Sequence, residues 1–241
     1  MTIKRKMKKQ TANKLLCLLL AVLLLAGQVL RAVALNPEGG PITIATSEDL
    51  KELAVQCTLD SWSQGKTVVL TDDINLSGSG FTPIPTFGGT FDGQGHTISG
   101  LTITGSGNTR GLFRYVQQGA NVRDLVIRGR SMPTGSRSTV GGIAGSNAGT
   151  LHNCRFEGVS SGASIVGGIV GVGGKNHVID RCASRGTMNG LDAMGGVAGL
   201  NEGRITDCTL SGSMGSATQD YIGGIAGLNV GGRTAGTIEN C

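Results

Sequence analysis

The cysteines are the residues whose spacing first suggests chemistry. Cys154, Cys182, Cys208 and Cys241 follow one another at intervals of 28, 26 and 33 residues, with an aliphatic residue three positions before each. A zinc site needs closely spaced ligand pairs, usually joined by histidine, and the sequence has none at these positions. Cysteine is also among the residue types most often buried. The pattern therefore favours a ladder of buried thiols over a disulfide or a metal site.

The histidines are not spaced to share a metal ion or to form a base with an orienting partner. His96 and His177 stand at the same position of the repeat that the cysteines mark, five residues before its reference point, but three repeats separate them. His152 falls at another position. Adjacent strands lie about 4.8 Å apart, so three coils of a repeat fold span roughly 14 Å. We expect exposed or turn positions for all three histidines.

The carboxylates are also scattered. Asp180 and Glu239 share a position of the repeat but lie two repeats apart, and Asp207 is one position out of line. Acid/base catalysis on glycans and calcium binding both need clustered carboxylates. Asp92 precedes a glycine in a turn pattern that explains it without chemistry. We therefore predict no catalytic, cofactor-binding or metal-binding residues and no cofactor, so the chain is not expected to be an enzyme by itself.

Three other charged residues predict a surface feature. Arg128, Glu157 and Arg185 occupy one position on three successive repeats. If the repeats stack as strands, these side chains lie next to one another, and opposite charges across strands contribute tenths of a kcal/mol per pair. The spacing predicts an exposed charge ladder.

A glycine pentad organises the elements that must position these residues. The pattern Gly-Gly-aliphatic-(Ala or Val)-Gly, each time after an apolar residue, occurs at residues 141–145, 167–171, 195–199 and 223–227. Repeats with a period of about 20–50 residues imply a solenoid. Each pentad is followed by a turn rich in glycine or asparagine, an aliphatic residue and the cysteine.

The repeat extends backwards in a weaker form. Leu125 and Leu101 take the place of the cysteine, and glycine stands four residues after this position in every repeat that can be read. Short alternating apolar runs indicate strands, and fixed glycines indicate turns. We therefore predict an all-β, right-handed parallel β-helix, the hand following from the usual chirality of parallel connections. Four pentad residues are expected to stack in one internal column: Ile143, Ile169, Val197 and Ile225.

The pentad with its closing cysteine resembles the GLUG repeat of bacterial secreted and surface proteins. The resemblance rests on GGIAGLNVG at 223–231 with IENC at 238–241, and on the lead-in FDGQGHTI at 91–98 followed by GLF at 111–113. It covers residues 42–241 and departs from the pattern at 173–176 and at an insertion around 231–236. The resemblance implies a β-helical fold and an adhesin-like setting, and it carries no specific activity.

The first 34 residues predict a signal peptide. A basic segment precedes an apolar core at 15–27 that is too short to span a bilayer comfortably, and Ala32-Val33-Ala34 supplies a cleavage site; an uncleaved anchor is the alternative. This segment carries 7 of the 21 basic residues, which leaves 14 against 16 acidic residues and a net charge of −2. The basic pI is therefore a property of the leader, and nucleic acid is not an expected partner.

We expect residues 35–86 to form an N-terminal cap and residues 87–241 to form the repeats. Thr46 and Asp49 have the spacing of a helix capping box, and Leu50, Leu53, Ala54 and Cys57 fall on one helical face. Such a helix would cover the open apolar end of a solenoid. Strands are expected at 68–70 and 74–76.

The sequence favours a secreted or cell-surface scaffold for adhesion or ligand binding. The expected partner is a protein or glycan at a cell surface, with no transmembrane helix after signal removal. The alternative is an accessory N-terminal region of a larger secreted enzyme, either a peptidase or a glycan-degrading protein. Because residue 241 falls in mid-strand, we also expect a longer protein or self-association through an open C-terminal coil.

Overall fold

The computed structural model describes residues 40–215, 221–230 and 236–241, so the predicted signal peptide lies outside the described residues. Residues from Pro41 to Cys241 form one compact unit. Its described residues include 25 strands in four parallel sheets that wind around a common core, together with one helix. The predicted parallel β-helix is confirmed.

Each turn of the solenoid contributes strands to the sheets in a fixed order. Sheet A has eight strands: β1 (Ile42–Ile44), β2 (Thr67–Leu70), β5 (Thr90–Asp92), β9 (Asn121–Arg123), β13 (Thr150–His152), β17 (Val178–Asp180), β21 (Arg204–Thr206) and β25 (Thr237–Glu239). Sheet B has six: β3 (Ile74–Asn75), β6 (Thr97–Ile103), β10 (Val126–Ser131), β14 (Arg155–Ser161), β18 (Ala183–Asn189) and β22 (Thr209–Met214).

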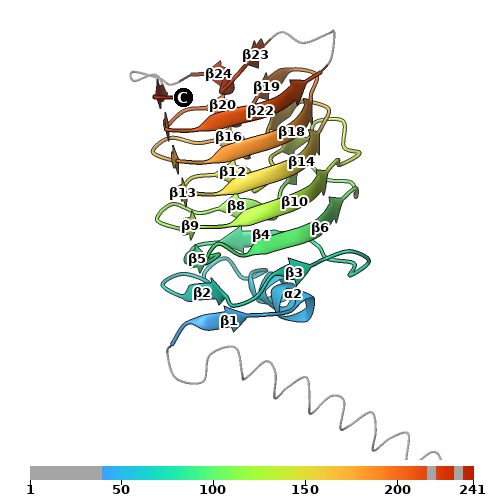
Figure 1. Ribbon diagram of the computed structural model, residues 1–241, viewed down its shortest axis with the longest axis vertical. Helices are drawn as coiled ribbons and strands as arrows, with labels where there is room; N and C mark the ends of the chain where they lie inside the picture. Colours follow the sequence, from blue (N-terminus) through green and yellow to red (C-terminus); the bar gives the residue numbers. More distant parts are fainter. Residues whose placement is uncertain (1–39, 216–220, 231–235) are drawn as a thin grey trace, which may run out of the picture. The chain divides into compact units, whose positions relative to one another are not determined.

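The other two sheets close the coil. Sheet C consists of β4 (Ile84–Phe87), β8 (Phe113–Val116), β12 (Ala144–Asn147), β16 (Val170–Gly173), β20 (Ala198–Asn201) and β24 (Ala226–Asn229). Sheet D consists of β7 (Thr109–Arg110), β11 (Thr139–Val140), β15 (Ile165–Gly167), β19 (Ala193–Gly195) and β23 (Tyr221–Gly223). In Figure 1 sheet B runs left to right across the front, sheet C lies behind it, and successive coils rise, which makes the coil right-handed.

The pentad glycines allow the coils to stack closely at the corner between sheets D and C. A Cβ at Gly195 would collide with the carbonyl oxygen of Ala198, and one at Gly196 would collide with the carbonyl oxygen of Gly224 on the next coil. A Cβ at Gly199 would lie 2.5 Å from the side chain of Ile165 on the preceding coil. These three glycines are therefore needed because backbone or packed side chains fill the space where a side chain would begin.

The predicted internal columns lie in the core. Hydrogen bonds link the four residues, because the backbone N–H of each one donates to the carbonyl oxygen of the next, from Ile143 through Ile169 and Val197 to Ile225. The side chains of Ile143, Ile169 and Val197 are fully buried. The thiols also stack: Cys154, Cys182 and Cys208 are buried, Cys241 is exposed, and all four are free.

Leu101 does not stand in the cysteine column, so the predicted register is wrong in the first regular coil. Thr97 already pairs with Val126 and Ile98 with Ile127, so Leu101 lies opposite Gly129, four residues beyond Leu125. The register also shifts by one residue between Ile98 and Leu101. Gly100 in this irregular stretch has a φ of 69°. An extra residue of this kind forms a bulge, which moves every following side chain along the partner strand.

The predicted cap helix is present as α2 (Ser47–Gln56). Thr46 and Asp49 form the capping box, with the Asp49 amide 3.2 Å from Thr46 Oγ1 and the Thr46 amide 3.0 Å from Asp49 Oδ2. Leu50, Leu53 and Ala54 are buried, and α2 contacts β4, the first strand of sheet C. The helix thus covers the first coil, where an open end would expose apolar side chains.

Candidate binding surface

The outer face of sheet A carries a column of polar side chains that interact from coil to coil. The strand register aligns Asp92, Arg123, His152, Asp180, Thr206 and Glu239 on successive coils. Arg123 Nη2 lies 2.6 Å from Asp92 Oδ2, and Asp180 accepts a hydrogen bond of 2.8 Å from Thr206 Oγ1. Beside this column, Arg204 pairs with Glu239 at 3.0 Å. The partners in these contacts lie on adjacent coils, so the ion pairs and hydrogen bonds of the column hold neighbouring coils together.

His152 and Asp180 form a couple that the sequence interpretation missed. His152 Nδ1 lies 2.8 Å from Asp180 Oδ2, which contradicts the expectation that no histidine has an orienting partner. Burial opposes ionisation of Asp180, but hydrogen bonds from Thr206 and His152 outweigh burial and lower its pKa. The signal was available in the sequence, since both residues stand two positions before a cysteine of successive repeats.

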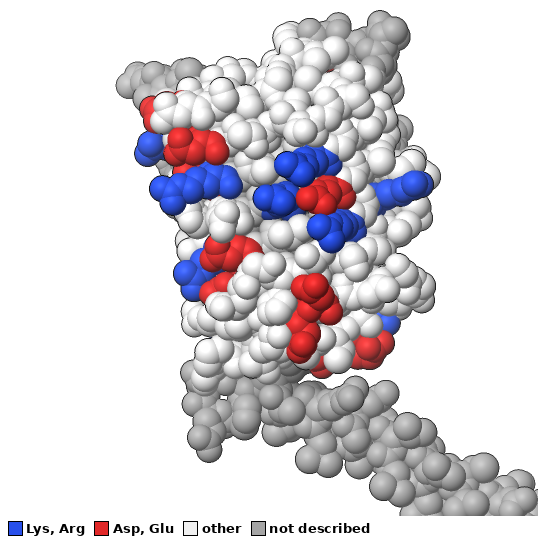
Figure 2. Space-filling view, viewed as in Figure 1, with Lys and Arg blue, Asp and Glu red and all other residues white. Residues whose placement is uncertain are grey.

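The predicted charge ladder lies on the outer face of sheet B. Arg128, Glu157 and Arg185 are direct neighbours in the strand register, and Arg128 Nε lies 2.7 Å from Glu157 Oε2. Arg155 Nη1 lies 3.6 Å from the other carboxylate oxygen of Glu157. The hydrogen bond from Arg128 is the main cause of the lowered pKa of Glu157. Figure 2 shows basic side chains gathered around one acidic side chain on this face.

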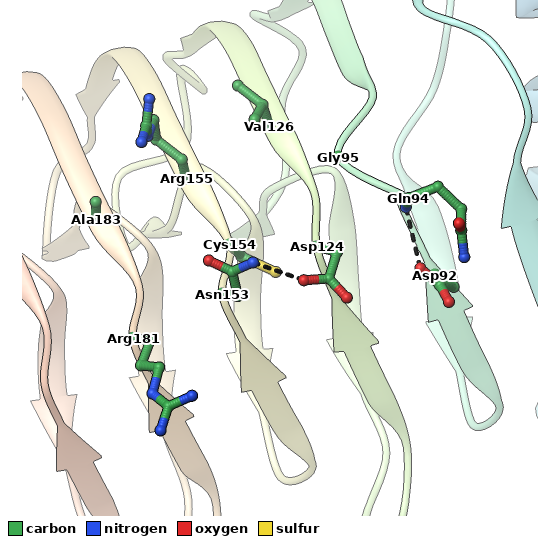
Figure 3. Close-up of a pocket in the computed structure, with 10 residues that line it drawn as sticks. All are labelled: Asp92, Gln94, Gly95, Asp124, Val126, Asn153, Cys154, Arg155, Arg181 and Ala183. Carbon is green, nitrogen blue, oxygen red and sulfur yellow. Dashed lines mark hydrogen bonds between the residues drawn. The ribbon is translucent and has the colours of Figure 1, made fainter.

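A groove follows the corner between sheets A and B, next to this ladder. Its volume is roughly 500 Å³, and Asp92, Asp124, Asn153, Arg155 and Arg181 contribute to its walls (Figure 3). The side chain of Asn153 donates a hydrogen bond of 2.6 Å to the Asp124 carboxylate, and the backbone N–H of Gln94 donates one of 3.0 Å to the Asp92 carboxylate. The groove therefore offers carboxylate, amide and guanidinium groups along one edge of the solenoid.

Left-handed backbone conformations form this corner. Asp124, Asn153, Arg181 and Asp207 have φ values of 51°, 49°, 52° and 51° and stand on successive coils immediately before the internal column of Leu125 and the cysteines. Asn and Asp tolerate this conformation better than other non-glycine residues. Asp207 therefore occupies one of these left-handed corner positions, which explains its place one residue before Cys208.

The other two histidines are divided between surface and core. His96 Nδ1 lies 3.2 Å from Asp73 Oδ1, which also accepts the Thr97 amide at 2.8 Å. His177 closes a turn, with its backbone amide 3.2 Å from the Gly174 carbonyl oxygen, but its side chain is fully buried, which corrects the expectation of an exposed position. Its Nδ1 lies 2.7 Å from the carbonyl oxygen of Gly174, and burial lowers its pKa. A side chain at residue 173 would collide with this ring, so the glycine there makes room for it.

Across the described ranges, no three His, Cys, Asp or Glu side chains stand together as a possible metal site. Within the same residues, no helix is both long and apolar enough to cross a membrane.

Comparison with known proteins supports the fold. No family model matches the sequence. Over 161 residues, 60% of this chain, it is 35% identical to halomucin of Haloquadratum walsbyi, but the chain spans only 2% of the length of that protein. A solved structure titled "putative immunoglobulin A1 protease", from Bacteroides ovatus, superposes with a TM-score of 0.58 over 83% of this chain and 74% of that one, at 19% identity. At that identity the structural likeness shows the fold alone. This chain is thus a β-solenoid scaffold, part of which is similar in sequence to a short segment of halomucin.

Proposed function

We propose that the chain is a secreted or cell-surface scaffold that presents its outward strand faces for adhesion or ligand binding. The observation that carries this proposal is the alignment of outward polar side chains on sheets A and B over several coils, beside a groove along their shared corner. Repetition at the strand spacing makes such faces suited to extended partners. The signal-peptide pattern and the GLUG resemblance support export and an adhesin-like role.

The His152–Asp180 couple does not carry a proposal of catalysis. Asp180 bonds to Thr206 on the next coil as well as to His152, so it links three coils. The pairs Asp92–Arg123 and Arg204–Glu239 connect coils on the same sheet in the same way. We therefore assign the couple to the contacts that hold the coils in register.

A second candidate is an accessory region of a larger secreted enzyme. The fold likeness to the Bacteroides ovatus protein, whose title names a protease, favours this candidate. In that arrangement the solenoid positions a ligand while another part of the protein performs the reaction.

Binding by the purified chain to arrays of glycans and extracellular proteins, and to whole cells, tests the proposed function. We expect saturable binding without turnover of any bound polysaccharide or peptide. Turnover that disappears in Asp180→Ala, but persists in Asp73→Ala, would replace the scaffold proposal with catalysis at the couple. Asp73 is a matched control because it also pairs with a histidine on an exposed surface.

We also propose self-association as a secondary property of the last described coil. Tyr221 and Ile222 are each 51% exposed, and Ile238 is 37% exposed. Sedimentation of the purified chain tests this proposal, since Ile222→Ser and Ile238→Ser should shift an associating sample toward monomer. A sample that is already monomeric at all concentrations contradicts it.

A further inference from the structure

The outer face of sheet B has an excess of positive charge. Arg128 and Arg130 on β10, Arg155 on β14 and Arg185 on β18 are all exposed, and Glu157 is the carboxylate among them. Glu157 pairs with Arg128 and Arg155. Within the described part of the chain, Arg130 and Arg185 form no ion pair with a carboxylate. Four cations against one anion leave this face with a surplus of three positive charges, although residues 35–241 carry a net charge of −2.

The arginines are spaced along the solenoid axis in a regular way. Arg128, Glu157 and Arg185 align in the strand register, and Arg155 lies two residues before Glu157 on the same strand. Successive coils are about 4.8 Å apart. This rise is close to the length of one sugar ring in an extended polysaccharide. A chain lying along the axis would therefore bring an acidic group to an arginine at nearly every coil it crosses, and a guanidinium binds carboxylate or sulfate through two parallel hydrogen bonds.

The adjoining groove adds groups that recognise hydroxyls. Arg155 belongs both to the sheet B face and to the groove wall, where Asp92, Asp124 and Asn153 stand beyond it (Figure 3). An ionised carboxylate has about four acceptor sites, so Asp124, which accepts one bond from Asn153, keeps sites for sugar hydroxyls, whereas Asp92 is buried and already bonded to Gln94 and Arg123. The same carboxylates repel a polymer that is densely charged with phosphate. The combination fits a ligand with both acidic groups and many hydroxyls.

We infer that the outer face of sheet B from β10 to β18, with the adjoining groove, binds an acidic polysaccharide that runs along the solenoid axis. This inference rests on the proposed ligand-binding function and names its surface and ligand class. Recognition is by charge and hydrogen bonding, which is consistent with a sequence that is only 3% aromatic. Carboxylated and sulfated polysaccharides both present anionic oxygens that can accept the paired hydrogen bonds of a guanidinium.

The test measures the affinity of the purified chain for polygalacturonate, heparin, neutral dextran, single-stranded DNA and phosphatidylserine vesicles. We expect binding to polygalacturonate or heparin that weakens with added salt, and no binding to dextran. The double variant Arg155→Gln/Arg185→Gln should weaken this binding at least tenfold. Lys175→Gln is the control, because Lys175 is an exposed cation in the turn between β16 and β17, outside this face and the groove, and it should change binding less than twofold. Thermal melting and circular dichroism check that each variant folds.

Three results would overturn the inference: no binding to either acidic polysaccharide, equal binding by the double variant, or DNA or vesicle binding of equal or higher affinity. The tests of the inference and of the proposed function remain separable. A chain that binds cells or other array members while ignoring acidic polysaccharides refutes the inference alone. A chain that binds nothing in either test refutes both.

Discussion

His177 is the side chain whose environment differs most from what its local sequence indicates. It lies between a lysine–asparagine turn and a strand, yet its ring is fully buried and its Nε2 has no hydrogen-bond partner among the described residues. Protonation would place a charge in the core, so burial lowers the pKa of the imidazole. The side chain fills space inside the solenoid as an uncharged ring.

We expect this histidine to make the fold sensitive to acid. Because the pKa in the folded state lies below the unfolded value of about 6.5, the unfolded chain takes up the proton more readily. The stabilising contribution is complete above about pH 6.5 and is lost as the pH falls through the lowered folded pKa. Urea unfolding at several pH values should show a smaller loss of stability in His177→Gln than in the wild type over this range. His96→Gln, which alters an exposed histidine, should keep the wild-type loss; parallel curves for wild type and His177→Gln would contradict the expectation.

The cysteines should differ in reactivity according to burial. Burial raises the pKa of Cys57 to about 11 and raises that of Cys182 well above its usual value. Burial also raises the pKa of Cys241, but this thiol is exposed and the reagent can reach it. The thiolate is the reactive form. Iodoacetamide at neutral pH should therefore label Cys241 in the native protein and reach Cys57, Cys154, Cys182 and Cys208 after denaturation. Peptide mass mapping checks this order, and equal native labelling at Cys182 and Cys241 would be inconsistent with a buried ladder.

At the scale of the element, the corner between sheets C and A depends on an asparagine column with one exchange. Asn147 and Asn201 are buried and their side chains accept backbone N–H groups two residues later, at 3.0 Å and 3.2 Å. Gly173 occupies the equivalent position on the coil between them. His177 stands where the neighbouring coils have Gly149 and Gly203, which precede Thr150 and Arg204 in the aligned strands. Glycine and a large ring have thus exchanged places within one coil.

This exchange predicts strong coupling between residues 173 and 177. Gly173→Asn alone should destabilise the protein by about 1–3 kcal/mol, because the new side chain overlaps the imidazole. His177→Gly alone should also destabilise by leaving an internal void. The double variant should restore an asparagine column from Asn147 to Asn201 and recover most of the loss. A double-mutant cycle by chemical denaturation measures the coupling, and additive effects would show that the two positions are independent.

Equivalent glycines should differ in importance according to what covers them. A Cβ at Gly196 would collide with the backbone of Gly224, whereas a Cβ at Gly224 meets nothing within 4 Å because no described coil covers it. We expect Gly196→Ala to cost about 1–3 kcal/mol, since a backbone atom cannot rotate out of the way. Gly224→Ala, the same change at the same position of the motif, should be nearly neutral. Melting temperatures compare the two, and equal losses would mean that the glycines act through backbone conformation alone.

At the scale of the whole molecule, burial decreases toward the last described coil. Val166 and Met194 are fully buried, whereas Ile222, which pairs with Met194 in sheet D, is 51% exposed. The aromatic cluster of Phe87, Phe91 and Phe113, with ring centroids 5.3–6.0 Å apart, lies in the early coils, near the helix cap. Stability in such a stacked fold is a sum of contacts between neighbouring coils, so the coils are not equally protected.

Hydrogen exchange should follow this gradient. We expect amides of β24 and β25 to exchange at least about tenfold faster than those of β12 and β13, because local opening of the last described coil removes fewer buried contacts. Native-state exchange followed by mass spectrometry measures the ratio. Equal protection along the solenoid would indicate that the last coil is covered by another molecule or that the coils unfold together.

The sequence alone determined the repeat, the parallel coil, the capping box of α2 and the outward ladder of Arg128, Glu157 and Arg185. These features follow from local periodicity, since residues at one position of a repeat meet the same environment on every coil. The pentad was readable for the same reason, because its glycines lie at the same crowded corner on each covered coil.

The tertiary structure decided the features that depend on how one coil meets another. Leu101 lies outside the cysteine column because Thr97 already pairs with Val126, and hydrogen bonding to β10, not residue counting, sets this register. His177 is buried because Gly173, on the same coil, leaves room for its ring. The shared position of His152 and Asp180 before their cysteines was readable in the sequence, but only the stacked strands bring the two side chains to 2.8 Å and gather the surplus arginines on sheet B.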